Sequence, residues 1–320
     1  MGGLQGSRAR DRVGEPHPDE PVLPPALTRA EIEARSPGAA HTLTGDVRLH
    51  AQVWSPLLGR ARNITVYLPP DYARRPRTRY PVFYLHDGQN LFDGATAFVP
   101  GQEWRLDETA ERLIRAREIE PIIMVGIDHA GPHRLDEFGP VRDARHRAGG
   151  LAHLYGRMIV EELKPLIDRT YRTRPGPQET GLGGASMGGL VTLFLGLDFP
   201  NVFGRLAILS PSVWWHERAI LRRVDALPRR LPLRIWLDIG TKEGHAALAD
   251  ARALRAALVA RGWREGRDLA YLEAEGAGHS EAAWAARVEP MLKFLFPPRQ
   301  GSRRRALGLS SRGGGGPDPR

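Results

Sequence analysis

Short apolar segments of strand length alternate with longer segments of helical period over most of the chain, from residue 82 to residue 296. The expected strands are residues 82–85, 121–127, 180–184, 205–209, 233–239 and 269–274, and the expected helices are residues 106–119, 151–171, 188–199, 246–261 and 281–296. Consecutive strands joined by a helix pair in parallel, and the helices cover the faces of the sheet. The sequence therefore predicts an α/β fold with a mostly parallel central sheet and helices on both faces. In such a sheet, functional residues gather at the carboxyl ends of the strands.

The two ends of the chain differ in composition from this region. Residues 1–40 are rich in proline and charge, which predicts a flexible N-terminal arm with one helical turn near Leu27 to Ala34. Residues 41–297 form the expected folded domain, which begins with the strand-like segment 45–68. Residues 298–320 carry six arginines and one aspartate, more than half of the formal net charge of +9, and predict a basic disordered tail. No aromatic residue lies between these arginines, so we expect a solvated tail and no nucleic-acid partner.

Cysteine is absent, which excludes a disulfide framework, a thiolate metal site and a cysteine nucleophile. No apolar segment approaches the ~20 residues that cross a bilayer, and the first 20 residues lack the apolar core of a secretory signal. We therefore expect a cytoplasmic protein without a membrane partner, and its oligomeric state stays open.

The segment Gly184-Ala-Ser-Met-Gly-Gly189 fits the G-x-S-x-G pattern of a nucleophile elbow. The expected strand 180–184 precedes it and the expected helix 188–199 follows it, as this turn requires. The flanking glycines remove side chains that would clash in a sharp turn, and the start of the helix favours negative charge. A glycine-rich turn with a surface serine is the alternative, but the context favours Ser186 as a nucleophile.

His279 follows the last expected strand, in Gly278-His279-Ser280. A histidine near the C-terminus and downstream of the serine has the position of the general base in the order nucleophile, acid, base. A solvated loop histidine is the alternative. The other ten histidines of the chain lack this context.

The acid that orients this histidine should come from the strand between the two residues. Glu243 lies on the loop after strand 233–239, where such a carboxylate belongs, whereas Asp238 lies within the strand. We favour Glu243 over Asp238. Asp250 is a third candidate, but its position indicates an exposed helix residue.

His86-Asp-Gly-Gln-Asn90 directly follows the expected strand 82–85. In this position we expect the backbone N–H of Gly88 or Gln89 to bind an oxyanion together with the N–H of Met187. No second histidine or carboxylate cluster stands at ligand spacing from His86, so we expect no metal and no cofactor.

Five motifs, in this order, resemble the enterochelin-esterase-like or esterase D type branch of the α/β hydrolases, over Arg62 to Phe296. They are Tyr80-Pro-Val-Phe-Tyr-Leu-His-Asp-Gly-Gln-Asn90, Gly184-Ala-Ser-Met-Gly-Gly189, Ser210-Pro-Ser-Val-Trp-Trp215, Gly240-Thr-Lys-Glu243 and Gly278-His279. The resemblance implies the α/β-hydrolase fold and a triad of Ser186, Glu243 and His279. Related sequences carry an aspartate where this chain has Glu243, and some relatives manage with a serine–histidine pair.

We therefore expect a serine esterase that hydrolyses a small-molecule carboxylic ester through an acyl-enzyme. The alternatives are an acyltransferase to a sugar or alcohol and a catalytically inactive binding protein of the same fold. Trp214 and Trp215 are candidates to line an aromatic pocket, although either could pack in the core. Arg134, together with Asp136 and Glu137, is a candidate to face the substrate from the loop after strand 121–127. A solvated loop is the alternative for these three residues.

Overall fold

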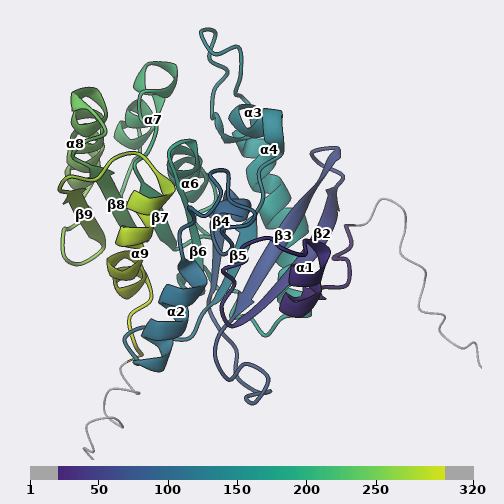
Figure 1. Cartoon of the computed structure of the whole chain (residues 1–320). Coiled ribbons are helices and arrows are strands. Elements are labelled where there is room, and N and C mark those ends of the chain that lie inside the picture. The colour runs from purple at the N-terminus through teal and green to yellow at the C-terminus, as the bar shows by residue number, and fades with distance from the viewer. Residues whose placement is uncertain (1–20, 300–320) are drawn as a thin grey trace, which may run out of the picture.

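A computed structural model describes residues 21–299, in which a nine-stranded sheet forms the centre of the molecule (Figure 1). The first half of the expected N-terminal arm and nearly all of the expected basic tail lie outside the described residues. The strand order is β1-β2-β3-β5-β4-β6-β7-β8-β9. The strands are β1 (Leu27–Thr28), β2 (Asp46–Ser55), β3 (Arg60–Leu68), β4 (Val82–His86), β5 (Ile123–Ile127), β6 (Thr180–Ala185), β7 (Arg205–Leu209), β8 (Arg234–Gly240) and β9 (Leu269–Ala274).

Parallel pairing joins the six strands from β4 to β9, and antiparallel pairing joins β1, β2 and β3 to one edge of them at β5. The predicted mostly parallel sheet is therefore confirmed. Strands β4 to β7 are apolar almost throughout because both of their faces are covered. All six parallel strands end at the same edge, which brings the loops after β4, β6, β7, β8 and β9 together.

Helices cover both faces of the sheet, as predicted (Figure 1). One apolar layer contains side chains from α4, α5, α6, α7 and α8, and the other contains side chains from α2 and α9. The helices are α1 (Arg29–Arg35), α2 (Leu106–Arg115), α3 (Arg134–Phe138), α4 (Ala152–Arg157), α5 (Lys164–Thr170), α6 (Met187–Asp198), α7 (Trp215–Asp225), α8 (His245–Ala260) and α9 (Glu281–Leu295).

Two expected segments differ in the structure. Residues 27–35, which we placed in the N-terminal arm, form β1 and α1, and β1 pairs with β2. A capping box between Thr28 and Glu31 starts α1, which is a longer element than the single turn expected there. The expected helix 151–171 is α4 and α5 with a π-helix over Met158–Leu163 between them. Pro165 follows this π-helix and has no backbone N–H, so it cannot donate the hydrogen bond of a regular α-helix.

Among residues 21–299, no helix combines the length and the apolar character that crossing a membrane requires.

Candidate active site

Ser186 occupies the sharp turn between β6 and α6. Its backbone lies at φ 59° and ψ −123°, a conformation that a residue with a side chain rarely adopts and that functional turns often retain. A Cβ at Gly184 would lie 2.9 Å from the backbone carbon of Gly188, and a Cβ at Gly189 would lie 2.8 Å from Leu209 O. Glycine is therefore required on both sides of the serine by close backbone packing.

The hydroxyl of Ser186 contacts a second serine. Ser186 Oγ lies 3.3 Å from Ser212 Oγ, and the backbone N–H of Ser212 donates to Ser186 O at 3.0 Å. Among the described residues, no hydrogen bond joins Ser186 to His279. Catalytic hydrogen bonds are often long before substrate binds, so this geometry is compatible with a nucleophile and base that meet in the complex.

His279 and Glu243 form a hydrogen-bonded pair. Nδ1 of His279 lies 2.6 Å from Oε2 of Glu243. The histidine follows β9 and its side chain is 44% exposed, whereas the glutamate side chain follows β8 and is 1% exposed. The ring of Trp284 meets the imidazole edge-on, with centroids 4.9 Å apart. The imidazole is therefore held at one nitrogen and along one edge, and its remaining surface is open.

The other carboxylate oxygen of Glu243 is held by its own loop and by the end of β7. Oε1 accepts hydrogen bonds from Gly240 N at 2.8 Å and from Ser210 Oγ at 2.6 Å. Burial raises the pKa of this carboxyl, but the hydrogen bonds from His279, Ser210 and Gly240 outweigh it and lower the pKa of Glu243 below its ordinary value. Glu243 therefore stays ionised and can stabilise a positively charged imidazole.

Asp238 lies within β8 and is fully buried, away from the imidazole. It accepts from Trp236 Nε1 at 2.7 Å and from Ser210 N at 3.3 Å, and Arg287 Nη2 lies 3.2 Å from it. Burial raises the pKa of Asp238 to about 6, although the Arg287 charge and the Trp236 and Ser210 hydrogen bonds oppose this. None of its hydrogen bonds reaches His279, so the geometry favours Glu243 as the acid.

Asp250, the third candidate for the acid, was expected to be an exposed residue of a helix. It lies on α8 and is only 3% exposed, so the expectation of exposure is wrong. Arg218 Nε lies 2.6 Å from its carboxylate. The packing of α7 against α8 covers this side chain, and Asp250 does not hydrogen-bond His279.

The loop after β4 carries the expected oxyanion donors. It turns at Asp87, with φ 56°, into a short 3-10 helix over Gly88–Asn90. A Cβ at Gly88 would lie 2.6 Å from the backbone carbon of Gly126, so only glycine lets this turn lie against β5. Within residues 21–299, neither the Gln89 N–H nor the Met187 N–H donates to a protein acceptor, and Met187 is the first residue of α6.

His86 lies in the core beneath this loop. It is fully buried, and its Nδ1 lies 2.8 Å from Tyr155 Oη. Burial lowers the pKa of His86 to about 3, which keeps the ring neutral. Its other nitrogen is buried without a hydrogen-bond partner among the described residues.

Arg134 binds Asp87, at the start of the loop after β4. Its Nε and Nη2 donate to the two carboxylate oxygens of Asp87 at 2.6 and 2.8 Å. A bidentate pair of this kind fixes orientation, so Arg134 positions the turn that precedes Gly88. A direct contact between Arg134 and substrate stays a prediction.

The alternative of a solvated loop fails for Glu137, which is buried, whereas Asp136 is partly exposed. Glu137 is fully buried between Arg60 and Arg62, with hydrogen bonds of 3.0 Å to each. Asp136 accepts from the backbone N–H of Gly149 at 3.0 Å. Both acids lie on α3, which the pattern of the sequence did not reveal, and both hold structure in place.

The two candidate aromatic residues have different surroundings. Trp215 is 2% exposed, and its Nε1 donates to Val141 O at 2.8 Å, so it packs in the core. Trp214 is 45% exposed and lies against the ring of His146, with centroids 5.1 Å apart. The segment after Trp214, where no helix was expected, forms α7, although His216–Arg218 depart from helical geometry. Trp214 is therefore the one of the two that offers a free aromatic surface.

Sequence reasoning missed the polar residues behind Glu243. Ser210 is 2% exposed and accepts from Trp284 Nε1 at 3.0 Å and from Arg287 Nη2 at 2.8 Å. The position of Ser210 directly after β7 was a usable signal, because side chains at this edge of the sheet converge. Arg287, a buried arginine on an otherwise apolar face of α9, has no local pattern that reveals its partner.

A mostly parallel sheet with helices on both faces, a serine at a strand-to-helix elbow and a histidine–carboxylate pair at the same edge define an α/β hydrolase. A family model described as "Putative esterase" matches residues 55–295, and the chain belongs to this family. The chain is a carboxylic-ester hydrolase of the enterochelin-esterase-like branch.

Three known proteins illustrate the similarity. YbbA of Bacillus subtilis, an uncharacterized protein, is 26% identical over 73% of this chain and 92% of its own length. The ferri-bacillibactin esterase BesA of Bacillus subtilis is 28% identical over 74% of this chain and 86% of its own length. The crystal structure of the BES protein from Bacillus cereus superposes with a TM-score of 0.64 and 23% identity, over 82% of this chain and 98% of that one.

Proposed function

We propose that this esterase works through an acyl-enzyme formed on Ser186, with His279 as general base and Glu243 as the acid that orients it. The observation that carries the proposal is the 2.6 Å contact between His279 Nδ1 and Glu243 Oε2, at the same edge of the sheet as the elbow serine. With Nδ1 engaged by a carboxylate, the neutral imidazole has its basic nitrogen at Nε2, the atom that must take the serine proton.

In the first half of the reaction, Ser186 Oγ attacks the ester carbonyl carbon and its proton moves to His279 Nε2. The carbonyl oxygen becomes an oxyanion, which the N–H groups of Met187 and of Gly88 or Gln89 bind. The intermediate collapses as the ester C–O bond breaks and His279 returns the proton to the leaving alcohol. Before attack, the Ser186 hydroxyl must exchange its contact with Ser212 for one with the histidine.

In the second half, a water molecule gives a proton to His279 and attacks the acyl carbon. Collapse of this second intermediate breaks the bond to Ser186 Oγ, which regains its proton, and releases the carboxylic acid. Because Glu243 stays ionised, it stabilises the imidazolium in both halves.

A fluorophosphonate probe tests the nucleophile directly. We expect one probe molecule on the peptide that contains Ser186, and no labelling of Ser186→Ala. The matched control is Ser55→Ala, which removes a buried serine on β2 that hydrogen-bonds Glu162 and has no hydrogen bond to Ser186, His279 or Glu243. Labelling of a different serine, or a folded Ser186→Ala protein with activity within about tenfold of wild type, would refute the assignment, since loss of such a nucleophile costs on the order of 10⁶ in kcat.

We further propose that the substrate is an ester with a compact or aromatic acyl group, of the kind found in catecholate siderophores. Similarity to the ferri-bacillibactin esterase supports this class, and the exposed ring of Trp214 supplies a flat apolar surface. A series of p-nitrophenyl esters from acetate to palmitate, measured beside a catecholate ester, tests it. A steady rise of kcat/KM with chain length and no cleavage of the catecholate ester would point to a lipid substrate instead.

A further inference from the structure

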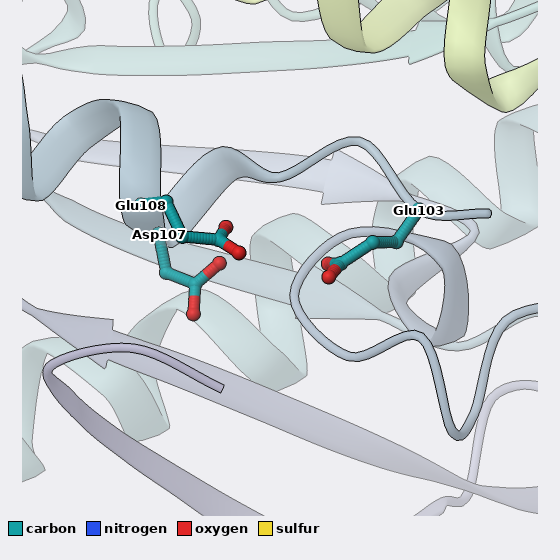
Figure 2. A group of neighbouring side chains, drawn as sticks. All are labelled: Glu103, Asp107 and Glu108. Carbon is teal, nitrogen blue, oxygen red and sulfur yellow. The ribbon is translucent and has the colours of Figure 1, made fainter. Parts of the chain in front are cut away.

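Three carboxylates that the proposed reaction does not use converge beside the N-terminus of α2. Glu103 comes from the loop before the helix, and Asp107 and Glu108 come from its first turn. One oxygen of each carboxylate lies within 4.8 Å of the other two. Figure 2 shows the three groups directed toward a common centre, although they come from two segments of the chain.

Buried oxygen atoms without hydrogen-bond donors mark this cluster as more than a group of acidic side chains. Glu103 is 5% exposed and Asp107 is fully buried. The Thr42 hydroxyl donates a hydrogen bond to one oxygen of Glu103. Thr44 N donates to one oxygen of Asp107 at 2.6 Å. Their other oxygens, Glu103 Oε2 and Asp107 Oδ1, and Glu108 Oε2 are buried with no hydrogen-bond partner among the described residues.

The neighbouring charges do not neutralise the cluster. Arg105 Nε lies 3.6 Å from Glu108 Oε1, but that arginine side chain is 68% exposed and reaches only the least buried of the three acids. The dipole of α2 stabilises the negative charges of Asp107 and Glu108, which lie in its first turn. It does not stabilise the charge of Glu103 in the same way, because Glu103 precedes the helix. Buried carboxylates in this situation share protons or bind a cation.

A cavity gives solvent access to the cluster. It has a volume of about 770 Å³ and is lined by Glu103, Glu108 and Thr42, by alanines of α9 and also by Arg105 and Arg112, whereas Asp107 lies behind this lining. An ion can therefore reach Glu103 and Glu108 from the cavity, and water can complete its coordination, which two or three carboxylates alone do not fill.

We propose that Glu103, Asp107 and Glu108 bind a hard divalent cation, with Ca²⁺ as the best fit. All available ligand atoms are carboxylate or hydroxyl oxygens, which Ca²⁺, Mg²⁺ and Mn²⁺ prefer and softer metals do not. The ligands come from a loop and a helix in an irregular arrangement, which suits the variable coordination geometry of Ca²⁺ better than the strict octahedron of Mg²⁺. The bound cation would tie the loop before α2 to the first turn of that helix. The expectation of no metal rested on the absence of ligand spacing around His86, whereas these three carboxylates lie further along the chain.

Direct binding to the full chain is the first test. After treatment with EDTA and dialysis, we expect isothermal titration with CaCl₂ to show saturable binding of one ion per chain. Terbium(III), a luminescent substitute for Ca²⁺, should be sensitised by tryptophan excitation, because Trp104 directly follows Glu103. CaCl₂ at about 100 times Kd should raise the thermal unfolding midpoint by several degrees, since the ion binds only the folded protein.

Two variants and a control assign the binding to these residues. Glu103→Gln and Asp107→Asn should each weaken Ca²⁺ binding at least tenfold and abolish most of the terbium signal. Glu289→Gln on α9 removes one carboxylate of the same charge, which pairs with Arg112 and Lys293 outside the cluster, and should bind Ca²⁺ as wild type does. These readouts do not depend on esterase activity, so they are independent of the proposed triad.

The wild-type titration alone can refute the site, whether or not the variants fold. Absence of saturable binding of Ca²⁺, Mg²⁺ and Mn²⁺ at millimolar concentration would overturn the proposal. A higher unfolding midpoint of Glu103→Gln or Asp107→Asn than of wild type in CaCl₂ would also overturn it, because it would show that the acids share protons. Saturable 1:1 binding of Mg²⁺ or Mn²⁺ that is lost in both variants would support the site.

Discussion

Ser210 Oγ donates a 2.6 Å hydrogen bond to one oxygen of the Glu243 carboxylate, whose other oxygen contacts His279. The same hydroxyl accepts hydrogen bonds from Trp284 and Arg287, both on α9, the helix that begins two residues after the histidine. One buried hydroxyl thus connects the end of β7, the proposed acid and the helix that follows the proposed base. Ser210 is therefore a positioning residue for the pair.

We predict that Ser210→Ala lowers kcat by roughly ten- to a hundredfold, because removal of one buried hydrogen-bond partner costs about 1–3 kcal/mol and here loosens the acid. Steady-state kinetics and thermal unfolding should be measured together. Ser55→Ala is the matched control, since Ser55 is buried and donates at 2.6 Å to Glu162. Equal losses of stability with equal, small effects on kcat in both variants would show that Ser210 has a structural role only.

Glu243→Gln should lower kcat far more than Asp238→Asn does. Of these two acids, only Glu243 contacts the imidazole. Loss of the residue that sets the histidine tautomer lowers kcat by a factor on the order of 10⁴. Both variants should be compared at equal folded fraction by circular dichroism. A larger loss of kcat in Asp238→Asn would mean that Asp238, on β8, is the acid. A small loss of kcat in both variants would indicate that a serine–histidine pair suffices.

Asp238 should make stability depend on pH in a specific direction. Burial raises its pKa to about 6 in the folded protein, whereas an unfolded aspartate titrates near about 3.9. Because the folded pKa is the higher one, the contribution of Asp238 to stability is fully present below about pH 3.9 and is lost as the pH rises through about 6. We expect urea unfolding to show that wild type loses stability relative to Asp238→Asn between about pH 4 and pH 6. A difference that does not change with pH would contradict the raised pKa.

Trp214 and Trp215 should separate substrate binding from stability. Trp214→Ala should raise KM for an aromatic ester several-fold and leave the unfolding midpoint nearly unchanged, because the ring is exposed. Trp215→Ala should cost about 3–5 kcal/mol of unfolding free energy, the usual result of truncating a buried aromatic residue. An unchanged KM for both aromatic and acetyl esters in Trp214→Ala would remove this residue from the binding surface.

Gly88→Ala should reduce kcat strongly with little change in KM. The added methyl group would lie 2.6 Å from the backbone of Gly126, so the turn that carries the proposed oxyanion donors must move. Gly176→Ala is the control, because its added methyl group meets nothing within 4 Å and its φ of −67° suits alanine. Wild-type kcat in Gly88→Ala would mean that this loop does not bind the oxyanion.

The elements of the fold could be predicted because each depends on neighbouring residues. The buried runs over β4 to β8 and the continuous apolar run of α6 are visible as local patterns, and G-x-S-x-G between a strand and a helix specifies the turn at Ser186. α3 and α7 were missed for the same reason. These segments are short or distorted, so they have too few turns to establish a helical period.

The sequence by itself determined the α/β architecture, the elbow serine and the choice of His279 and Glu243, since all of these follow from residue type and order along the chain. Only the tertiary structure decided that Trp215 is buried and Trp214 exposed, that Arg134 binds Asp87, and that Ser210 supports the acid. It also brought Glu103 beside Asp107 and set both against Thr42 and Thr44. Apart from Glu103 and Asp107, which are four residues apart, these partners are distant in sequence. Burial and pairing of polar groups are settled by packing between elements, which no local pattern records.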